Sequence, residues 1–222
     1  MSLATTALHQ AQTLIEITAT AAFALSGVLA AARKRLDAVG VVAVAFLAAF
    51  GGGTVRDLLL DRRPFFWVAQ PAMLWGVLGL ALAAMTLMRA RHQPITERAM
   101  QWPDALGLGL FAAGGTQLAL GTPTPDGTPL PALAAVLMGV VTAVFGGVLR
   151  DIVCNEIPQA FHDHRPYAVC AFAGGWVLVG LQGLGLQAQW SLAAAAATAT
   201  LLRAAAVLLD WRLPAWSLER PR

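Results

Sequence analysis

A run of glycines followed by an Arg-Asp pair occurs twice in the chain. The first copy is GGGTVRDLLLDRRP at residues 51–64, and the second is GGVLRDIVCNEIP at residues 146–158. The two copies are about 94 positions apart, because Gly52 aligns with Gly146. The match extends upstream, where three residues recur about 88 positions later, namely Glu16, Phe23 and Gly27 as Asp104, Phe111 and Gly115. The sequence therefore predicts two copies of one structural unit.

The composition indicates that this unit folds in a membrane. Hydrophobic residues make up 58% of the chain and charged residues 12%, about half the charged share of an average soluble domain. An apolar run of about 20 residues can span a bilayer as a helix. Seven runs qualify, at roughly 13–32, 37–60, 69–89, 103–121, 130–153, 166–185 and 190–211. We expect an all-α membrane protein with a single transmembrane domain over residues 1–222.

The number of spans in each copy determines how the copies are related. The first copy covers about 13–89 and the second about 103–185, with three apolar runs in each, and the seventh run at about 190–211 has no counterpart. Because three crossings reverse the direction of the chain, the second copy is expected to be inverted in the membrane. Inverted repeats are typical of transporters and of some pores, with the working site near the midplane where the repeats meet.

The basic residues of the loops predict the orientation. Loops on the cytoplasmic side carry an excess of Lys and Arg. With seven spans, one side receives ten basic residues, namely Arg33, Lys34, Arg35, Arg89, Arg91, Arg98, Arg165, Arg212, Arg220 and Arg222. The other side receives only Arg62 and Arg63. The N-terminus is therefore predicted outside and the C-terminus in the cytoplasm.

The repeated glycines predict broken helices. Glycine has a low helix propensity, and three in a row at Gly51, Gly52 and Gly53 favour a kink or an unwound turn in the second helix. The fifth helix carries Gly146 and Gly147 at the equivalent place. Carbonyls freed at such a break would attract cations. The alternative is that the glycines only allow two helices to cross closely. We favour the break, because it would occur at equivalent positions in both copies.

The Arg-Asp pairs carry charge into apolar segments, where it is costly without a use. Successive side chains of a helix point about 100° apart. Each arginine is therefore not expected simply to neutralise the aspartate beside it. The symmetry of the repeat instead suggests crossed pairs between the copies, Arg56 with Asp151 and Arg150 with Asp57. They would act either as a gate or as a clamp that holds the copies together.

Other ionisable residues give weaker signals. Glu16 and Asp104 are secondary candidates for the site. They are expected near helix starts, where a carboxylate can serve as a cap. Arg203 in the seventh run is expected to be structural. His162, Asp163 and His164 have the composition of metal ligands, but we interpret them as a solvated turn, and no metal site is predicted.

The sequence also argues against several functions. We find no nucleophile motif, no HExxH metalloprotease motif and no phosphate-binding loop, so we do not expect an enzyme. The basic residues form no dense patch interleaved with aromatic residues, so we do not expect nucleic-acid binding.

The repeated motifs resemble a known family. FGGGTVRDLLL with Pro64, and FGGVLRDIV with Pro158, resemble the paired motifs of the prokaryotic trimeric intracellular cation (TRIC) channels. Residues 22–27, AFALSG, and residues 110–115, LFAAGG, are also similar to that family. The resemblance implies a seven-helix protomer, a homotrimer in the bacterial inner membrane and one pore in each protomer, lined by helices two and five.

The same resemblance assigns roles to the motif residues. It implies an ion path along Gly51, Gly52, Gly53, Thr54, Gly146 and Gly147, with the charge pairs of Arg56, Asp57, Arg150 and Asp151 beside it. The expected permeant ions are potassium and, less favoured, sodium. The expected partners are further copies of the chain and membrane lipid, with no cofactor.

A second hypothesis is a secondary transporter of a small solute such as glycine. Half-helix N-termini and an arginine could hold the carboxylate of a zwitterion. Arg56 and Arg150 would supply that arginine. The residues alone leave both hypotheses open, and the resemblance places the channel first.

Overall fold

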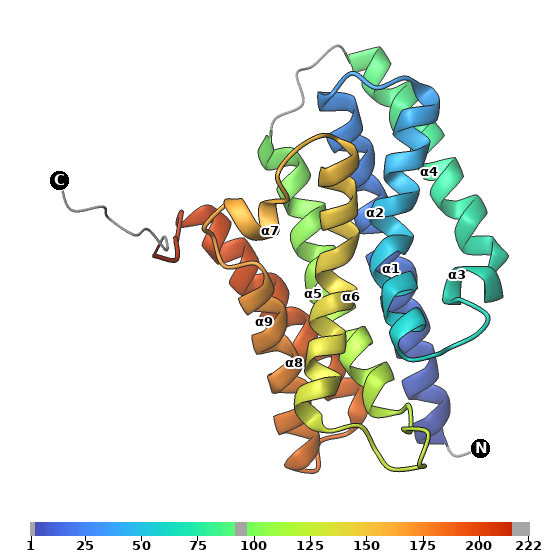
Figure 1. The fold of residues 1–222 in the computed structure, drawn as a ribbon, viewed down its shortest axis with the longest axis vertical. Coiled ribbons are helices and arrows are strands. Elements are labelled where there is room, and N and C mark those ends of the chain that lie inside the picture. Colours follow the sequence, from blue (N-terminus) through green and yellow to red (C-terminus); the bar gives the residue numbers. More distant parts are fainter. Residues whose placement is uncertain (1–2, 92–96, 215–222) are drawn as a thin grey trace.

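The structure is a computed structural model that describes residues 3–91 and 97–214 of the 222-residue chain (Figure 1). Within these ranges the chain forms seven helices of at least 16 residues and two helices of four residues. The long helices are α1 (Leu3–Arg33), α2 (Ala38–Leu59), α4 (Pro71–Arg91), α5 (Glu97–Leu120), α6 (Ala132–Val153), α8 (Ala168–Gly183) and α9 (Ala188–Leu208). The short ones are α3 (Phe66–Ala69) and α7 (Gln159–His162). Each of the seven predicted segments coincides with one long helix, which confirms the all-helical prediction.

Two helices begin well before their predicted segments. α1 begins at Leu3 and not near residue 13, and α5 begins at Glu97 and not near residue 103, so that Pro103 lies inside α5. In both cases polar turns precede the apolar run. Hydrophobicity marks the part of a helix that suits lipid, whereas the helix itself continues as long as the backbone can be hydrogen-bonded.

Five of the described helices are long and apolar enough to cross a membrane: α1, α2, α4, α6 and α9. α8 is apolar but shorter, and α5 carries charged residues in its first turns. The chain is therefore a multi-pass membrane protein.

The long helices form two groups that pack side by side. α1, α2 and α4 contact one another, as do α5, α6 and α8, and the two groups meet where α1 packs on α5 and α2 packs on α6. Successive long helices run in alternate directions in Figure 1, so α5 runs opposite to α1. α9 packs on α5 and α8 and has no counterpart beside α1 and α4.

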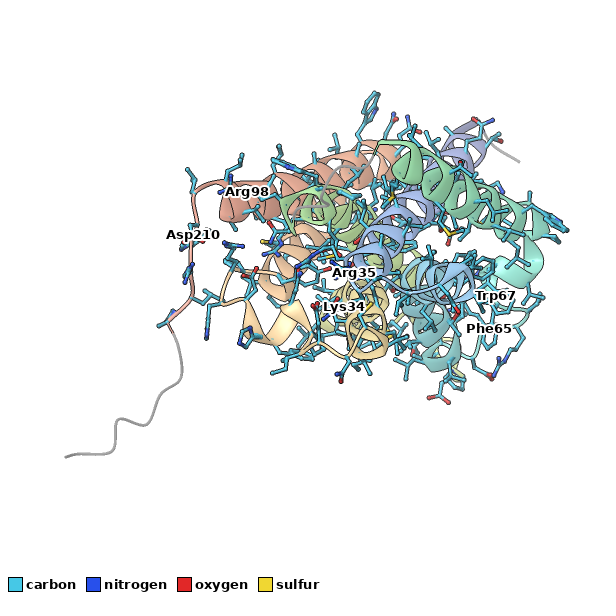
Figure 2. All side chains as sticks on the ribbon, turned by 90° about the horizontal axis from the view of Figure 1, so that it is seen from above. Lys34, Arg35, Phe65, Trp67, Arg98 and Asp210 are labelled. Carbon is cyan, nitrogen blue, oxygen red and sulfur yellow. The ribbon has the colours of Figure 1, made fainter. Side chains whose placement is uncertain are left out.

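The basic loops gather at one end of the bundle. Lys34, which follows α1, forms an ion pair with Glu156, which follows α6, at 2.8 Å. Figure 2 looks onto this end, where Lys34, Arg35, Arg98 and Asp210 are labelled. Arg220 and Arg222, which contributed to the predicted orientation, lie outside the described residues. Arg62 and Arg63 follow α2 at its other end.

Candidate functional site

The glycine runs do not break their helices. α2 continues through Gly51, Gly52 and Gly53, and α6 continues through Gly146 and Gly147. The predicted breaks are therefore wrong, and with them the expectation of free carbonyls. Tertiary contact overrides the low helix propensity of glycine, because Gly52 and Gly146 lie at a helix crossing where an added Cβ would overlap the backbone of the other helix.

The glycines allow α2 and α6 to touch backbone to backbone. A Cβ at Gly52 would overlap the carbonyl oxygen of Thr142, and a Cβ at Gly146 would overlap the carbonyl oxygen of Ala48. Gly51 faces α6 at the same crossing, where its added Cβ would lie 3.7 Å from Gly146 Cα. The alternative of close helix crossing is the one that the structure supports.

The remaining glycines of the motifs make room for aromatic side chains. A Cβ at Gly53 would overlap the ring of Phe66, which starts α3. A Cβ at Gly147 would lie 3.2 Å from Tyr167 Oη. Beside Gly53, the Thr54 hydroxyl donates to the carbonyl of Phe50 at 2.7 Å and accepts from Trp67 Nε1 at 3.0 Å. The predicted path residues thus lie together at the α2–α6 crossing and against the segments that follow these helices.

Each arginine pairs with the aspartate beside it. Arg56 Nε donates to Asp57 Oδ1 at 2.9 Å, and Arg150 Nε donates to Asp151 Oδ1 at 2.8 Å. The predicted crossed pairs between the two copies are therefore wrong. The long arginine stem bends back far enough to overcome the 100° angle between neighbours, and the guanidinium offers several donors in a fork.

A backbone donor holds each of these aspartates in place. Asp57 Oδ2 accepts the N–H of Phe66, the first residue of α3, at 2.8 Å. Asp151 Oδ2 accepts the N–H of Gln159, the first residue of α7, at 2.9 Å. The first N–H groups of a helix have no partner within the helix. The two short helices thus orient the carboxylates toward the arginines.

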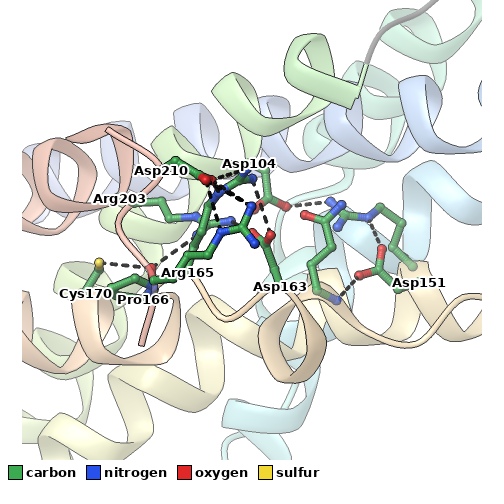
Figure 3. Close-up of polar contacts among 11 residues, drawn as sticks. Asp104, Asp151, Asp163, Arg165, Pro166, Cys170, Arg203 and Asp210 are labelled. Carbon is green, nitrogen blue, oxygen red and sulfur yellow. Dashed lines mark hydrogen bonds and ion pairs between the residues drawn. The ribbon is translucent and has the colours of Figure 1, made fainter. Parts of the chain in front are cut away.

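The secondary candidates Glu16 and Asp104 complete the two groups. Arg56 Nη1 donates to Glu16 Oε1 at 3.4 Å. Arg150 Nη1 donates to Asp104 Oδ1 at 2.5 Å, in the group whose Asp104 and Asp151 are labelled in Figure 3. Glu16 lies well inside α1, and Asp104 is the eighth residue of α5. The expectation that they cap helix starts is therefore wrong. We call Glu16, Arg56 and Asp57 the first cluster and Asp104, Arg150 and Asp151 the second cluster.

The clusters are buried and have an excess of acid. Both arginines are 1% exposed. Each cluster holds two carboxylates and one guanidinium, which gives a formal charge of −1 when both acids are ionised. A buried charge without a counter-charge is costly. With both acids ionised, each cluster would favour a cation nearby and disfavour an anion.

Sequence reasoning missed the uncharged neighbours of the clusters. Arg56 lies over the Phe66 ring, with 5.2 Å from Cζ to the ring centroid. Arg150 Nη1 also donates to Ser26 Oγ, which brings α1 into the second cluster. Tyr167, the one tyrosine of the chain, is buried beside this cluster. Ser26 lies in the repeated AFALSG stretch, but its counterpart there is Gly114, so the repeat gave no signal for it.

Arg203 of α9, for which we expect a structural role, contacts the segment that leads into α8. Its Nη1 donates to the carbonyl of Pro166 at 3.2 Å, its Nη2 donates to Asp163 Oδ2 at 3.3 Å, and its Cζ lies 4.8 Å from the centroid of the Tyr167 ring. Among the described residues no group of three His, Cys, Asp or Glu side chains could hold a metal ion. Asp163 pairs with Arg203 and Arg165, and His162 is the last residue of α7, so residues 162–164 form only in part the solvated turn that we predicted.

The segment after α9 is fastened to the same turn. Arg165 Nη2 donates to Asp210 Oδ1 at 2.7 Å, and the N–H of Leu213 donates to the carbonyl of His164 at 2.7 Å. Hydrogen bonds from Arg165 and Arg212 lower the pKa of the exposed Asp210 carboxyl from its usual 3.8. Because the folded pKa is depressed, this link is present at neutral pH and is lost as the pH falls through the lowered pKa.

Comparisons with known proteins identify relatives over most of the chain. A family model described as glycine transporter matches residues 13–89 and 101–183. The inner membrane protein YadS of Escherichia coli strain K12 is 34% identical, with 92% of this chain and 96% of YadS aligned. A membrane protein of Vibrio cholerae is 32% identical over 93% of this chain and 83% of its own length.

Solved structures resemble the whole bundle. A TRIC trimeric intracellular cation channel orthologue from Rhodobacter sphaeroides superimposes with a TM-score of 0.81 at 36% identity, covering 90% of this chain and 98% of the orthologue. A prokaryotic TRIC channel solved in KCl superimposes with a TM-score of 0.82 at 27% identity, covering 92% and 100%.

Proposed function

The chain belongs to the family of the prokaryotic TRIC channels, and on this basis we propose that it forms a homotrimer in which each protomer conducts potassium and, less well, sodium. The likeness to solved cation channels supports a cation channel as such. The proposal adds the trimer, the selectivity and a path within each protomer, along the crossing of α2 and α6.

The acid excess of the two buried clusters carries the proposal. An ion that crosses the protein must find compensating charge at membrane depth. One carboxylate more than guanidinium in each cluster provides this charge for a cation. We propose that Thr54 and the glycine crossing line the narrow part of the path, and that carboxylates, not free carbonyls, supply its polarity.

The two clusters occupy equivalent places, which supports an inverted repeat. Glu16, Arg56 and Asp57 recur as Asp104, Arg150 and Asp151, each aspartate is held by a short helix, and α5 runs opposite to α1. We propose that α1–α4 and α5–α8 are the two repeats, with α9 as an added helix. The gathering of basic residues at one end supports an N-terminus outside the bacterial inner membrane and a cytoplasmic C-terminus.

A glycine transporter is the second candidate, since the matching family model bears that description. In that mechanism an arginine would bind the carboxylate of the substrate. Arg56 and Arg150 are each already paired with two carboxylates. The geometry therefore favours the channel.

Reconstitution in liposomes separates the two functions. We expect unitary potassium currents and no counterflow of labelled glycine in the same preparation. Saturable glycine exchange without unitary currents would establish the transporter instead.

A charge-neutralising variant tests the role of the clusters. Glu16→Gln raises the formal charge of the first cluster from −1 to 0. A unit charge about 8 Å from the ion is worth roughly 2 kcal/mol at an effective dielectric constant of about 20. Because every 1.4 kcal/mol is about a factor of ten, we expect potassium conductance to fall by up to roughly 30-fold. The preference for cations over anions should also weaken, as measured by reversal potentials in a KCl gradient.

Glu156→Gln is the matched control. Glu156 is partly exposed, pairs with Lys34 and lies outside both clusters. Its variant should conduct like the wild type. Equal conductance in the Glu16→Gln variant would show that the first cluster does not act on the ion.

A further inference from the structure

An apolar cleft of about 420 Å³ lies between α1 and α4, with Gln70 among its lining residues. Its volume falls in the range of small-molecule sites, about 300–1,000 Å³. α4 is the least covered of the five candidate spans, with 22% of its apolar window buried against 44–56% in the others. The cleft is therefore open on the side of the bundle where α4 lies.

The equivalent position in the other half is filled by α9. A Cβ at Gly109 of α5 would lie 2.6 Å from the carbonyl oxygen of Ala196. A Cβ at Gly174 of α8 would lie 2.9 Å from the carbonyl oxygen of Ala195 and 2.8 Å from Ala199 Cβ. The two glycines thus let the backbone of α9 rest directly on α5 and α8.

The counterparts of these two contact residues line the cleft. In the sequence repeat, Gly109 corresponds to Ala21, 88 positions earlier, and Gly174 corresponds to Leu80, 94 positions earlier. Both Ala21 and Leu80 line the cleft. A third lining residue, Met73, is related by 94 to Tyr167, whose ring lies under Arg203 of α9. The cleft is thus the first-half version of the surface on which α9 packs.

Contacts confirm that the offset of 94 holds for α4 and α8. Val77 of α4 packs in one group of buried apolar residues with Ala24 and Ala49. The counterpart of Val77 is Ala171, which packs in another group of buried apolar residues with Ala112 and Ala143. These two alanines are the counterparts of Ala24 and Ala49. The two surfaces can therefore be compared residue by residue.

The cleft differs from the α9 surface in a way that indicates its occupant. Ala21 and Leu80 carry side chains where the second half has glycines. A helix backbone, which needs small residues to come so close, cannot sit at the depth of α9. A thinner and flexible apolar chain can.

Thr20 adds a polar group to the cleft. It is 3% exposed and lines the cleft, and its Oγ1 has no hydrogen-bond partner among the described residues. A buried hydroxyl without a partner is costly, and a ligand oxygen would relieve that cost. The position equivalent to Thr20 in the second half is Leu108, so the hydroxyl belongs to the open surface alone.

We propose that the cleft binds an acyl chain of a membrane phospholipid, in the place that α9 takes in the other half. Leu80, Met73 and Ala21 contact the chain, and Thr20 and Gln70, which also line the cleft, are the polar residues available to the ester group. This goes beyond ion conduction and does not depend on which solute is carried.

Two glycines of α4 provide a matched test. A Cβ at either Gly76 or Gly79 meets no atom within 4 Å, so a side chain can be introduced at both without a clash at its first atom. Gly76 lines the cleft, whereas Gly79 is absent from its lining. Gly76→Phe therefore fills the cleft and Gly79→Phe does not. The measurement is native mass spectrometry of the protein extracted from bacterial membranes in mild detergent, which counts retained phospholipids per protomer.

We expect one retained phospholipid per protomer in the wild type and in Gly79→Phe, and an occupancy at least ten-fold lower in Gly76→Phe. Thr20→Val should weaken retention several-fold without filling the cleft. Equal retention in both glycine variants would overturn the proposal. Loss of the oligomer in Gly76→Phe alone would also overturn it, because the occupant would then be another copy of the chain. Potassium currents recorded in parallel report on the channel independently.

Discussion

Arg150→Met is expected to lower the thermal stability of the protein more than any other single change considered. Asp104 and Asp151 would remain buried without their counter-charge. Removing one partner of a buried ion pair costs about 3–5 kcal/mol. For a chain of this size, each kcal/mol shifts the midpoint by roughly 2–4 °C. The unfolding midpoint, followed by tryptophan fluorescence in detergent, should therefore fall by roughly 6–20 °C.

The control for this prediction is Arg212→Met, which removes an exposed arginine from its pair with the exposed Asp210. Exposed pairs contribute about 0–1 kcal/mol, so the midpoint should hardly move. Adding Asp104→Asn to Arg150→Met should recover part of the loss, since one uncompensated charge is removed. If Arg150→Met and Arg212→Met had the same unfolding midpoint, the second cluster would not contribute to holding α5 and α6 together.

Gly52→Ala is expected to destabilise the protein although alanine is the better helix former. The added methyl group would overlap the carbonyl oxygen of Thr142, which is part of a backbone and cannot turn away. α2 and α6 would have to separate. Overpacking of this kind costs about 1–3 kcal/mol, which corresponds to a fall in the midpoint of roughly 2–12 °C. Potassium flux through the variant should change as well, because the crossing lies on the proposed path.

Gly76→Ala should shift the stability in the opposite direction. Its Cβ meets nothing within 4 Å, and replacing glycine by alanine inside a helix contributes about 0.5–1 kcal/mol. Opposite signs for the two glycines would establish that close packing is the role of Gly52. A gain in stability for both variants would contradict the backbone contact at the crossing.

Much of the fold could be predicted because its signals are local. Seven apolar runs gave seven long helices, and the main error was at the polar first turns of α1 and α5, where hydrophobicity no longer reports on the helix. The repeat also indicated the two distant acids that pair with the arginines. Glu16 and Asp104 attracted attention because they recur, and both lie in the clusters.

The role of the glycines could not be predicted from their pattern. A glycine run is equally compatible with an unwound turn and with a close crossing. What distinguishes them is the approach of Thr142, about 90 positions further along the chain, to Gly52. The partners of Arg56 and Arg150 were missed for a similar reason. The orientation of Asp57 depends on the N–H of Phe66, which is available only because α3 starts there.

By itself the sequence determined that the protein lies in a membrane, where its helices are and that its charged motifs come in equivalent pairs. These properties depend on composition and on comparing the chain with itself. Only the tertiary structure decided that α2 and α6 are unbroken, that each arginine binds its own neighbour and a distant acid, and that α9 covers one half while the other stays open. Each of these depends on distances of a few ångströms between residues far apart in the chain, and such distances follow from packing.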